Sequence, residues 1–144
     1  MVYEERNTWA TLIATIITVP VYVIVILMSA GGGPLTEVDW VPIMLWTVGA
    51  SIVGAIVISI LWGMAAGMRD PDGVGASDVR DRDISRFGGR VGYGVLVAAA
   101  LGALVLSMFE ADWFWIGNAL FLGFALSTLA GDIVRVVAYR RGIA

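Results

Sequence analysis

The sequence predicts an all-α integral membrane protein, an antiparallel bundle of four transmembrane helices. Four long runs of uncharged residues carry this prediction, together with a hydrophobic content of 59% and a mean hydropathy of +0.87. Only 15% of the residues are charged, whereas soluble domains carry about 25%. Four crossings of a hydrocarbon core about 30 Å thick use most of the chain, so we expect residues 1–144 to form a single transmembrane domain.

The first half of the chain contains two predicted spans, near residues 8–29 and 41–67. No charged residue occurs between Asn7 and Thr36, and the acidic start of the chain is unlike a secretory signal, so we expect a retained helix. The connection after it is rich in turn residues, beginning Gly31-Gly-Gly-Pro34.

The second half contains the other two predicted spans, near residues 91–109 and 113–138. The uncharged runs within them, 91–109 and 113–131, are each close to the ~20 residues that a helix needs to cross a bilayer. They leave little length for tilt.

Between the halves lies the densest block of charge, which we interpret as a cytoplasmic loop over residues 69–90. We expect a short helix at the membrane surface, with Asp83 and Arg86 paired at i and i+3. Its apolar side would consist of Val79, Ile84, Phe87 and Val91. The block is either a solvated, self-paired surface or a docking site for a cytosolic regulatory protein. The candidate partner-binding residues are Asp78, Arg80, Asp81, Arg82, Asp83, Arg86 and Arg90.

The distribution of Arg predicts the orientation of the spans. The two remaining connections contain no Arg, and all nine basic residues lie at the N-terminal end, in the central block or near the C-terminal end. Because basic residues concentrate on the cytoplasmic side, both termini should be cytoplasmic. We therefore expect a multi-pass protein of the cell (inner) membrane, with the lipid bilayer as its first partner.

The two external connections resemble each other, since Glu37-Val-Asp39-Trp40 and Glu110-Ala-Asp112-Trp113 share the pattern E-x-D-W. Carboxylates stabilise helix N-termini and Trp favours the headgroup zone, so physical chemistry alone can produce both copies. The alternative is an ancient duplication that made two repeated helical hairpins.

The fourth predicted span contains the ionisable residues that lie at membrane depth. Asn118 and Asp132 are separated by two intervals of seven, so they share one face of a helix, and Arg135 at i+3 can pair with Asp132. An intramembrane carboxylate indicates either a functional site or a structural ion pair. The sequence leaves both alternatives open.

Small residues recur at every fourth position in three of the spans, and such ridges let helix backbones approach closely. The ridges are Thr47, Ser51, Ala55, Ser59, Gly63 and Gly67; Gly94, Ala98 and Gly102; and Gly123, Ser127 and Gly131. The first of them is either a helix-packing surface or a polar permeation stripe. We expect the last ridge to face lipid and to bind a second copy, which predicts a homodimer or larger homo-oligomer.

The composition argues against most catalytic chemistry. The chain has no Cys and no His, which removes thiolate nucleophiles, imidazole bases and the usual zinc and haem ligands. No candidate nucleophile stands beside a carboxylate that could act as its base. We therefore expect no enzyme, no catalytic residue, no metal, no cofactor and no direct contact with nucleic acid.

Three stretches, 78–88, 114–120 and 136–142, resemble an uncharacterised family of small four-span membrane proteins of bacteria and archaea. The resemblance covers the second half well and the first half loosely. It implies a gene that is often encoded beside small helix-turn-helix regulators, and no established activity. Trp113 and Gly117 depart from the family, which often has His before its Phe-Trp-Ile and Ala before its Asn.

Two functional hypotheses follow. The first is an accessory or regulatory membrane protein whose charged cytoplasmic loop docks a cytosolic partner. The alternative is a small oligomeric transporter or channel with Asp132 and Asn118 on its pathway.

Overall fold

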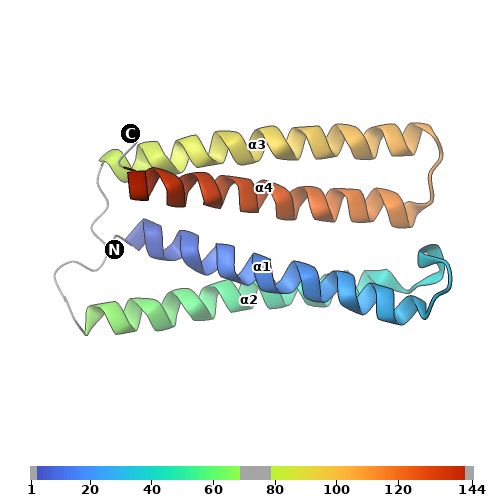
Figure 1. The fold of residues 1–144 in the computed structure, drawn as a ribbon, viewed down its shortest axis with the longest axis horizontal. Helices are drawn as coiled ribbons and strands as arrows, with labels where there is room; N and C mark the ends of the chain where they lie inside the picture. Colours follow the sequence, from blue (N-terminus) through green and yellow to red (C-terminus); the bar gives the residue numbers. More distant parts are fainter. Residues whose placement is uncertain (1–2, 69–78, 142–144) are drawn as a thin grey trace.

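The computed structural model describes residues 3–68 and 79–141 (Figure 1). Within these residues the chain forms four long helices and a short 3-10 turn, which are α1 (Tyr3–Ala30), η1 (Leu35–Glu37), α2 (Trp40–Gly67), α3 (Val79–Met108) and α4 (Trp113–Arg141). All four long helices of the described part are long and apolar enough to cross a membrane. The predicted all-α, four-helix, multi-pass membrane fold is therefore confirmed.

The helices pack antiparallel in the order α3, α4, α1, α2, so α4 and α1 are central and α2 and α3 lie at the edges (Figure 1). The first turn of α1, the last turn of α4 and the start of α3 lie at the same end of the molecule. Two hairpins, α1–α2 and α3–α4, lie side by side with their turns at the other end, as two repeats would. The duplication itself stays a prediction.

The helix boundaries follow local chemistry. α1 ends where Gly31 and Gly32 adopt positive φ angles of 53° and 87°, a conformation that glycine adopts without steric penalty. α4 begins after Asp112, whose Oδ1 accepts a hydrogen bond from the Phe114 N–H at 2.8 Å. This bond satisfies one of the free donors of the first helical turn.

An aromatic core joins the two hairpins at their turn ends. Tyr22, Trp40 and Phe114 are buried together, and the rings of Trp40 and Trp113 lie 5.0 Å apart. The two E-x-D-W copies therefore meet through their tryptophans. A Cβ atom at Gly117 would overlap the Trp40 ring, which explains why a residue without a side chain occupies this position.

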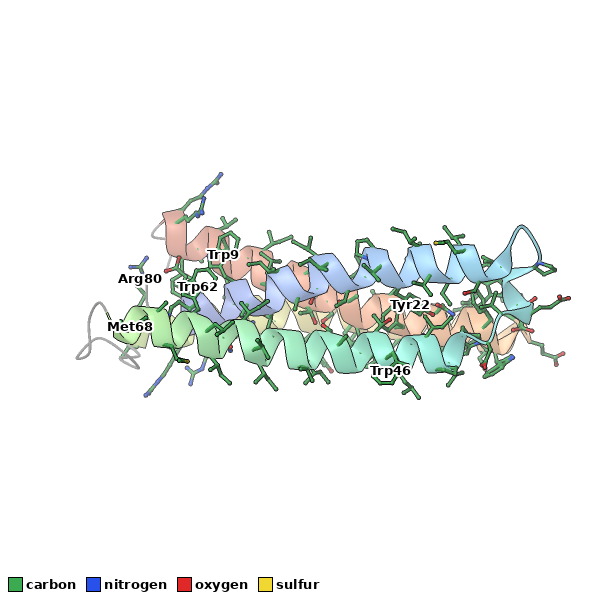
Figure 2. The ribbon with its side chains drawn as sticks, turned by 90° about the horizontal axis from the view of Figure 1, so that it is seen from below. Trp9, Tyr22, Trp46, Trp62, Met68 and Arg80 are labelled. Carbon is green, nitrogen blue, oxygen red and sulfur yellow. The ribbon has the colours of Figure 1, made fainter. Side chains whose placement is uncertain are left out.

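The six tryptophans lie toward the two ends of the bundle, as expected for aromatic belts at two membrane interfaces. Trp9 and Trp62 lie toward the same end of the bundle as Arg80 and Met68, whereas Trp46 projects from the outside of α2 toward the other end (Figure 2). The helices span about 42 Å or more at 1.5 Å per residue, which exceeds a ~30 Å hydrocarbon core. Their ends consequently reach the headgroup zones.

The structure corrects the predicted boundary of the charged loop. Residues 79–90 form the beginning of α3, continuous with the span, and no separate surface helix precedes it in the described residues. The expected apolar side is also divided, because Ile84 is buried whereas Val79 and Phe87 are exposed. The reason is that α4 extends alongside, so Ile84 packs toward it together with the buried Gly88.

The prediction that the ridge Gly123, Ser127 and Gly131 faces lipid is wrong. Ser127 Oγ donates a hydrogen bond to the Gly92 carbonyl oxygen at 2.7 Å, and a Cβ atom at Gly131 would lie 3.0 Å from the Gly88 carbonyl oxygen. The ridge therefore packs against α3 within one protomer, where Gly88 and Gly92 provide a matching surface. This ridge therefore cannot be the interface of the predicted homo-oligomer, which itself stays a prediction.

The other two ridges lie on different surfaces. On α3, a Cβ atom at Gly94 or Gly102 would have nothing within 4 Å, so these glycines do not face α4. The helix contacts α4 through Gly88 and Gly92 instead. On α2, Ser59 Oγ donates a hydrogen bond to Asn7 Oδ1 of α1 at 3.2 Å. Ser59 of this ridge therefore contacts α1, whereas a Cβ atom at Gly63 would have nothing within 4 Å, so only part of the ridge packs against a helix.

Candidate functional site

Asp132 is the centre of the polar structure inside the membrane. Its side chain is 2% exposed. Oδ2 accepts a hydrogen bond from Thr11 Oγ1 at 2.7 Å, and Oδ1 accepts one from Arg135 Nη1 at 2.9 Å. The predicted ion pair between Asp132 and Arg135 is confirmed, while Thr11 of α1 was not foreseen. The carboxylate thus connects α4 to α1 and holds the Arg135 side chain in place.

Arg135 extends this network to α3. Its Nη2 makes a long contact of 3.5 Å with the Ser85 carbonyl oxygen, and its Nε has no partner among the described residues. A Cβ atom at Gly88 would lie 2.9 Å from this Nε, so the Arg135 side chain lies flat over a glycine backbone. One ion pair on α4 therefore contacts both neighbouring helices.

Asn118 forms a second, separate polar contact. Tyr22 OH of α1 donates a hydrogen bond to Asn118 Oδ1 at 2.6 Å, and Asn118 Nδ2 donates one to the Phe114 carbonyl oxygen at 2.8 Å. Asn118 and Asp132 thus share the face toward α1, as predicted. They do not form one site, because fourteen residues at 1.5 Å each place them ~21 Å apart along the helix.

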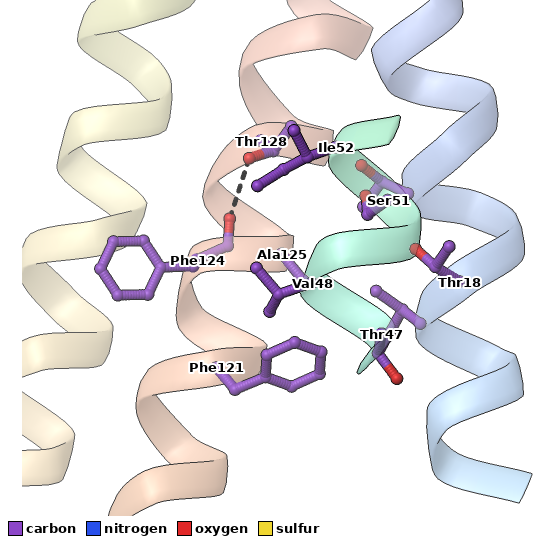
Figure 3. Close-up of a pocket in the computed structure, with 11 residues that line it drawn as sticks. Thr18, Thr47, Val48, Ser51, Ile52, Phe121, Phe124, Ala125 and Thr128 are labelled. Carbon is purple, nitrogen blue, oxygen red and sulfur yellow. Dashed lines mark hydrogen bonds between the residues drawn. The ribbon is translucent and has the colours of Figure 1, made fainter. Parts of the chain in front are cut away.

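A pocket of about 340 Å³ lies between these two contacts, where α2 and α4 both border α1 (Figure 3). Hydroxyl-bearing side chains line it, namely Thr15, Thr18, Thr47, Ser51 and Thr128. At least four of them donate to the carbonyl oxygen four residues earlier on their own helix, as Thr128 does to Phe124 at 3.1 Å. Because these donors are satisfied and no charged residue lines the pocket, it suits an apolar chain better than an ion.

A smaller, more polar crevice of about 210 Å³ opens between α3 and α4 beside the ion pair. We call it the Arg135 crevice, and its lining includes Gly89, Gly92 and Tyr93 of α3 with Thr128, Asp132 and Arg135 of α4. Sequence reasoning did not find it. The one available signal was the pair Gly88-Gly89, which lacks side chains at the position where the charged turns meet the apolar span.

The fold buries some residues of the charged block and exposes others. Asp81 is buried at 4% exposure, whereas Arg80, Arg82, Asp83, Arg86 and Arg90 are exposed. Asp83 and Arg86 form the predicted i, i+3 pair at 3.7 Å, although both side chains are well exposed and the pair contributes little. The remaining candidate, Asp78, lies outside the described residues. The accessible surface of these turns is therefore positive, and not balanced as the sequence suggested.

The two ends of the bundle carry opposite charge. Exposed Glu37, Asp39, Glu110 and Asp112 lie at the turn end, and exposed Arg140 and Arg141 lie at the other end near the start of α3. The Arg140 guanidinium stacks over the Trp9 ring, with 5.6 Å between its Cζ and the ring centroid. In the described ranges 3–68 and 79–141, no three His, Cys, Asp or Glu side chains are grouped so that they could hold a metal ion.

Comparison with known proteins finds no family model, no curated protein and no solved structure that matches this chain.

Proposed function

We propose that this chain is an accessory membrane protein of the cell membrane that docks an acidic surface of a cytosolic regulatory protein. The observation that carries the proposal is the sorting of charge on the first turns of α3, where Asp81 is buried and the arginines are exposed. An exposed basic surface attracts an acidic partner and accelerates its association at low salt.

The length of α3 supports docking outside the membrane. If the apolar boundary lies near Arg90, where the uncharged run begins, Arg82 stands about 12 Å beyond it at 1.5 Å per residue. Headgroups occupy roughly 5–8 Å on each side of the hydrocarbon core. Arg80 and Arg82 would therefore be accessible to a soluble protein.

The proposed orientation places both termini in the cytoplasm. Its support is the contrast between the acidic turn end and the basic end of the bundle, because the positive-inside rule assigns the basic end to the cytoplasm. The proposed partner then approaches from the side on which regulatory proteins are found.

The alternative proposal, an oligomeric transporter or channel with Asp132 and Asn118 on its pathway, has less support. Both side chains bind α1, and the pocket between them is lined by no charged residue and by hydroxyls of which at least four bond within their own helices. A homodimer or larger homo-oligomer also stays a proposal, and its interface would lie elsewhere than the ridge that α3 covers.

Purification from native membranes at low and high salt tests the docking proposal. We expect a co-purifying soluble protein at 0.1 M salt that is lost near 1 M, because the Debye length falls from about 10 Å to about 3 Å. The substitutions Arg80→Gln and Arg82→Gln together should release it, whereas Arg140→Gln with Arg141→Gln removes the same charge elsewhere and should retain it. A partner that survives the first pair of substitutions, or a chain that purifies alone at low salt, contradicts the proposal.

A further inference from the structure

The Arg135 crevice lies where the charged turns of α3 meet its apolar span. Gly89 and Tyr93 line it, and Arg86 precedes Gly89 by three residues, so the three share one side of the helix. Arg86 is exposed above the crevice, and Tyr93, at 70% exposure, lies one turn deeper. Arg86 therefore stands one turn before the part of the crevice that Gly89 and Tyr93 line.

The Arg135 guanidinium has unused donor capacity toward this space. Of its terminal nitrogen atoms, Nη1 is bound to Asp132, whereas Nη2 makes only the 3.5 Å contact, and the side chain remains 28% exposed. Guanidinium groups bind phosphate oxygens through several N–H donors at once. Asp132 keeps the group oriented without consuming all of its donors.

Glycines give the crevice its depth. A Cβ atom at Gly89 would meet only Arg135 Nη2, at 3.9 Å, so the missing side chain leaves open space directly beside the guanidinium. The Arg135 side chain itself rests on Gly88, where a Cβ atom would collide with it. A ligand oxygen can therefore approach Arg135 from the Gly89 side.

The position of the crevice along the bundle indicates the class of ligand. Gly89 is adjacent to Arg90, at the boundary between the charged turns and the uncharged run. If the apolar boundary lies near Arg90, the crevice opens at the level of the lipid headgroups. Basic pockets between transmembrane helices on the cytoplasmic side recognise anionic headgroups. Arg86 and Arg90 add positive potential that disfavours a choline cation and favours a net negative headgroup.

We propose that the Arg135 crevice binds the phosphate of an anionic lipid headgroup, with Arg135 and Arg86 as its donors and Gly89 as the position that admits it. This site is separate from the proposed docking of a soluble partner, because it depends on neither Arg80 nor the outermost turn of α3.

Lipid titration of the full chain in mild detergent, followed by native mass spectrometry, tests the site. The probes are dioleoyl phosphatidylglycerol and dioleoyl phosphatidylcholine. We expect tighter binding of phosphatidylglycerol, and Gly89→Leu should abolish this preference by filling the crevice. Gly94→Leu is the matched control, since it adds the same side chain to the same helix where nothing lies within 4 Å. Wild-type protein without a preference, or equal losses in the two variants, overturns the proposal.

A second pair of variants tests the donor. Arg86→Gln should weaken phosphatidylglycerol binding about five-fold, the effect expected for one Arg near an anionic surface, and Arg141→Gln should leave it unchanged. The melting temperatures without lipid should stay equal, because both side chains are exposed. Inorganic phosphate is the competitor that distinguishes the source, and displacement of the lipid by millimolar phosphate would overturn the assignment to a lipid headgroup.

Discussion

The two faces of α4 make contact with their neighbours in opposite ways. Toward α3, the face consists of Gly123, Ser127 and Gly131, and backbone lies close to backbone. Toward α1, the face presents Asn118 and Asp132, whose side chains form hydrogen bonds of 2.6 and 2.7 Å. Between the hairpins, α4 is therefore held by polar side chains that reach α1. Within its own hairpin, α4 packs through small residues that let the backbones approach, and Ser127 adds a hydrogen bond.

This difference determines which substitutions each contact tolerates. In a bilayer the lipid tails are as apolar as Leu, so helices associate through close packing and through polar bonds between them. Close packing is lost when atoms are added, because the backbones must separate. Polar contacts are lost when atoms are removed, because a buried partner is left unsatisfied. The two faces should therefore fail under opposite kinds of mutation.

The largest expected effect is on the α1 face. Asp132→Ala removes the acceptor of both Thr11 and Arg135 and leaves a cation without its partner within the bundle. We expect a loss of about 3 kcal/mol in the free energy of unfolding, the low end for a broken buried pair, because Arg135 is partly exposed. Reversible unfolding in mixed detergent micelles measures it. Asp39→Ala, at an exposed position, should change little, and similar losses for both variants would show that Asp132 does not connect the helices.

The next effect concerns the α3 face. A Cβ atom at Gly92 would lie 2.8 Å from the Ser127 carbonyl oxygen, and a backbone atom cannot move aside as a side chain would. Gly92→Leu should therefore cost about 1–3 kcal/mol of unfolding free energy through overpacking. Gly94→Leu, two residues further along the same helix and facing open space, is the control and should cost less than Gly92→Leu. If both variants unfold alike, the close approach of α3 and α4 is not what stabilises this hairpin.

Local sequence relations predicted the elements of the α4 site but not their neighbours. The pair Asp132 and Arg135 follows from i, i+3 spacing, and the shared face of Asn118 and Asp132 follows from the helical period. Thr11 is 121 residues from Asp132 in the chain, and Tyr22 is 96 residues from Asn118. No periodic pattern predicts the register between α1 and α4, that is, which turn of one helix contacts which turn of the other.

The α4 ridge also shows that a sequence pattern can predict a packing surface without predicting its partner. The spacing of Gly123, Ser127 and Gly131 indicated a surface for close packing, and that much is confirmed. It did not indicate whether α3 or a second copy would cover it, because both would present the same kind of surface. The wheel position of Asp81 was readable, since it precedes the buried Ile84 and Gly88 by three and seven residues. The balance of Arg and Asp in the charged block suggested a solvated surface instead, so the burial of Asp81 was not predicted.

The smallest expected effect returns to the α1 face and separates hydrogen bonding from packing. Tyr22→Phe removes one hydroxyl and retains the ring, whose centroid lies 4.6 Å from that of Phe121. Interhelical hydrogen bonds in membranes contribute about 0.6 kcal/mol on average, so the loss of unfolding free energy should be near that value. Tyr93→Phe removes an exposed hydroxyl from α3 and should cost nothing measurable. A Tyr22→Phe loss as large as that of Asp132→Ala would mean that the neutral contact holds the hairpins together as firmly as the charged one. The α1 face would then depend on buried hydrogen-bond geometry, and the charge on Asp132 would be free for another role.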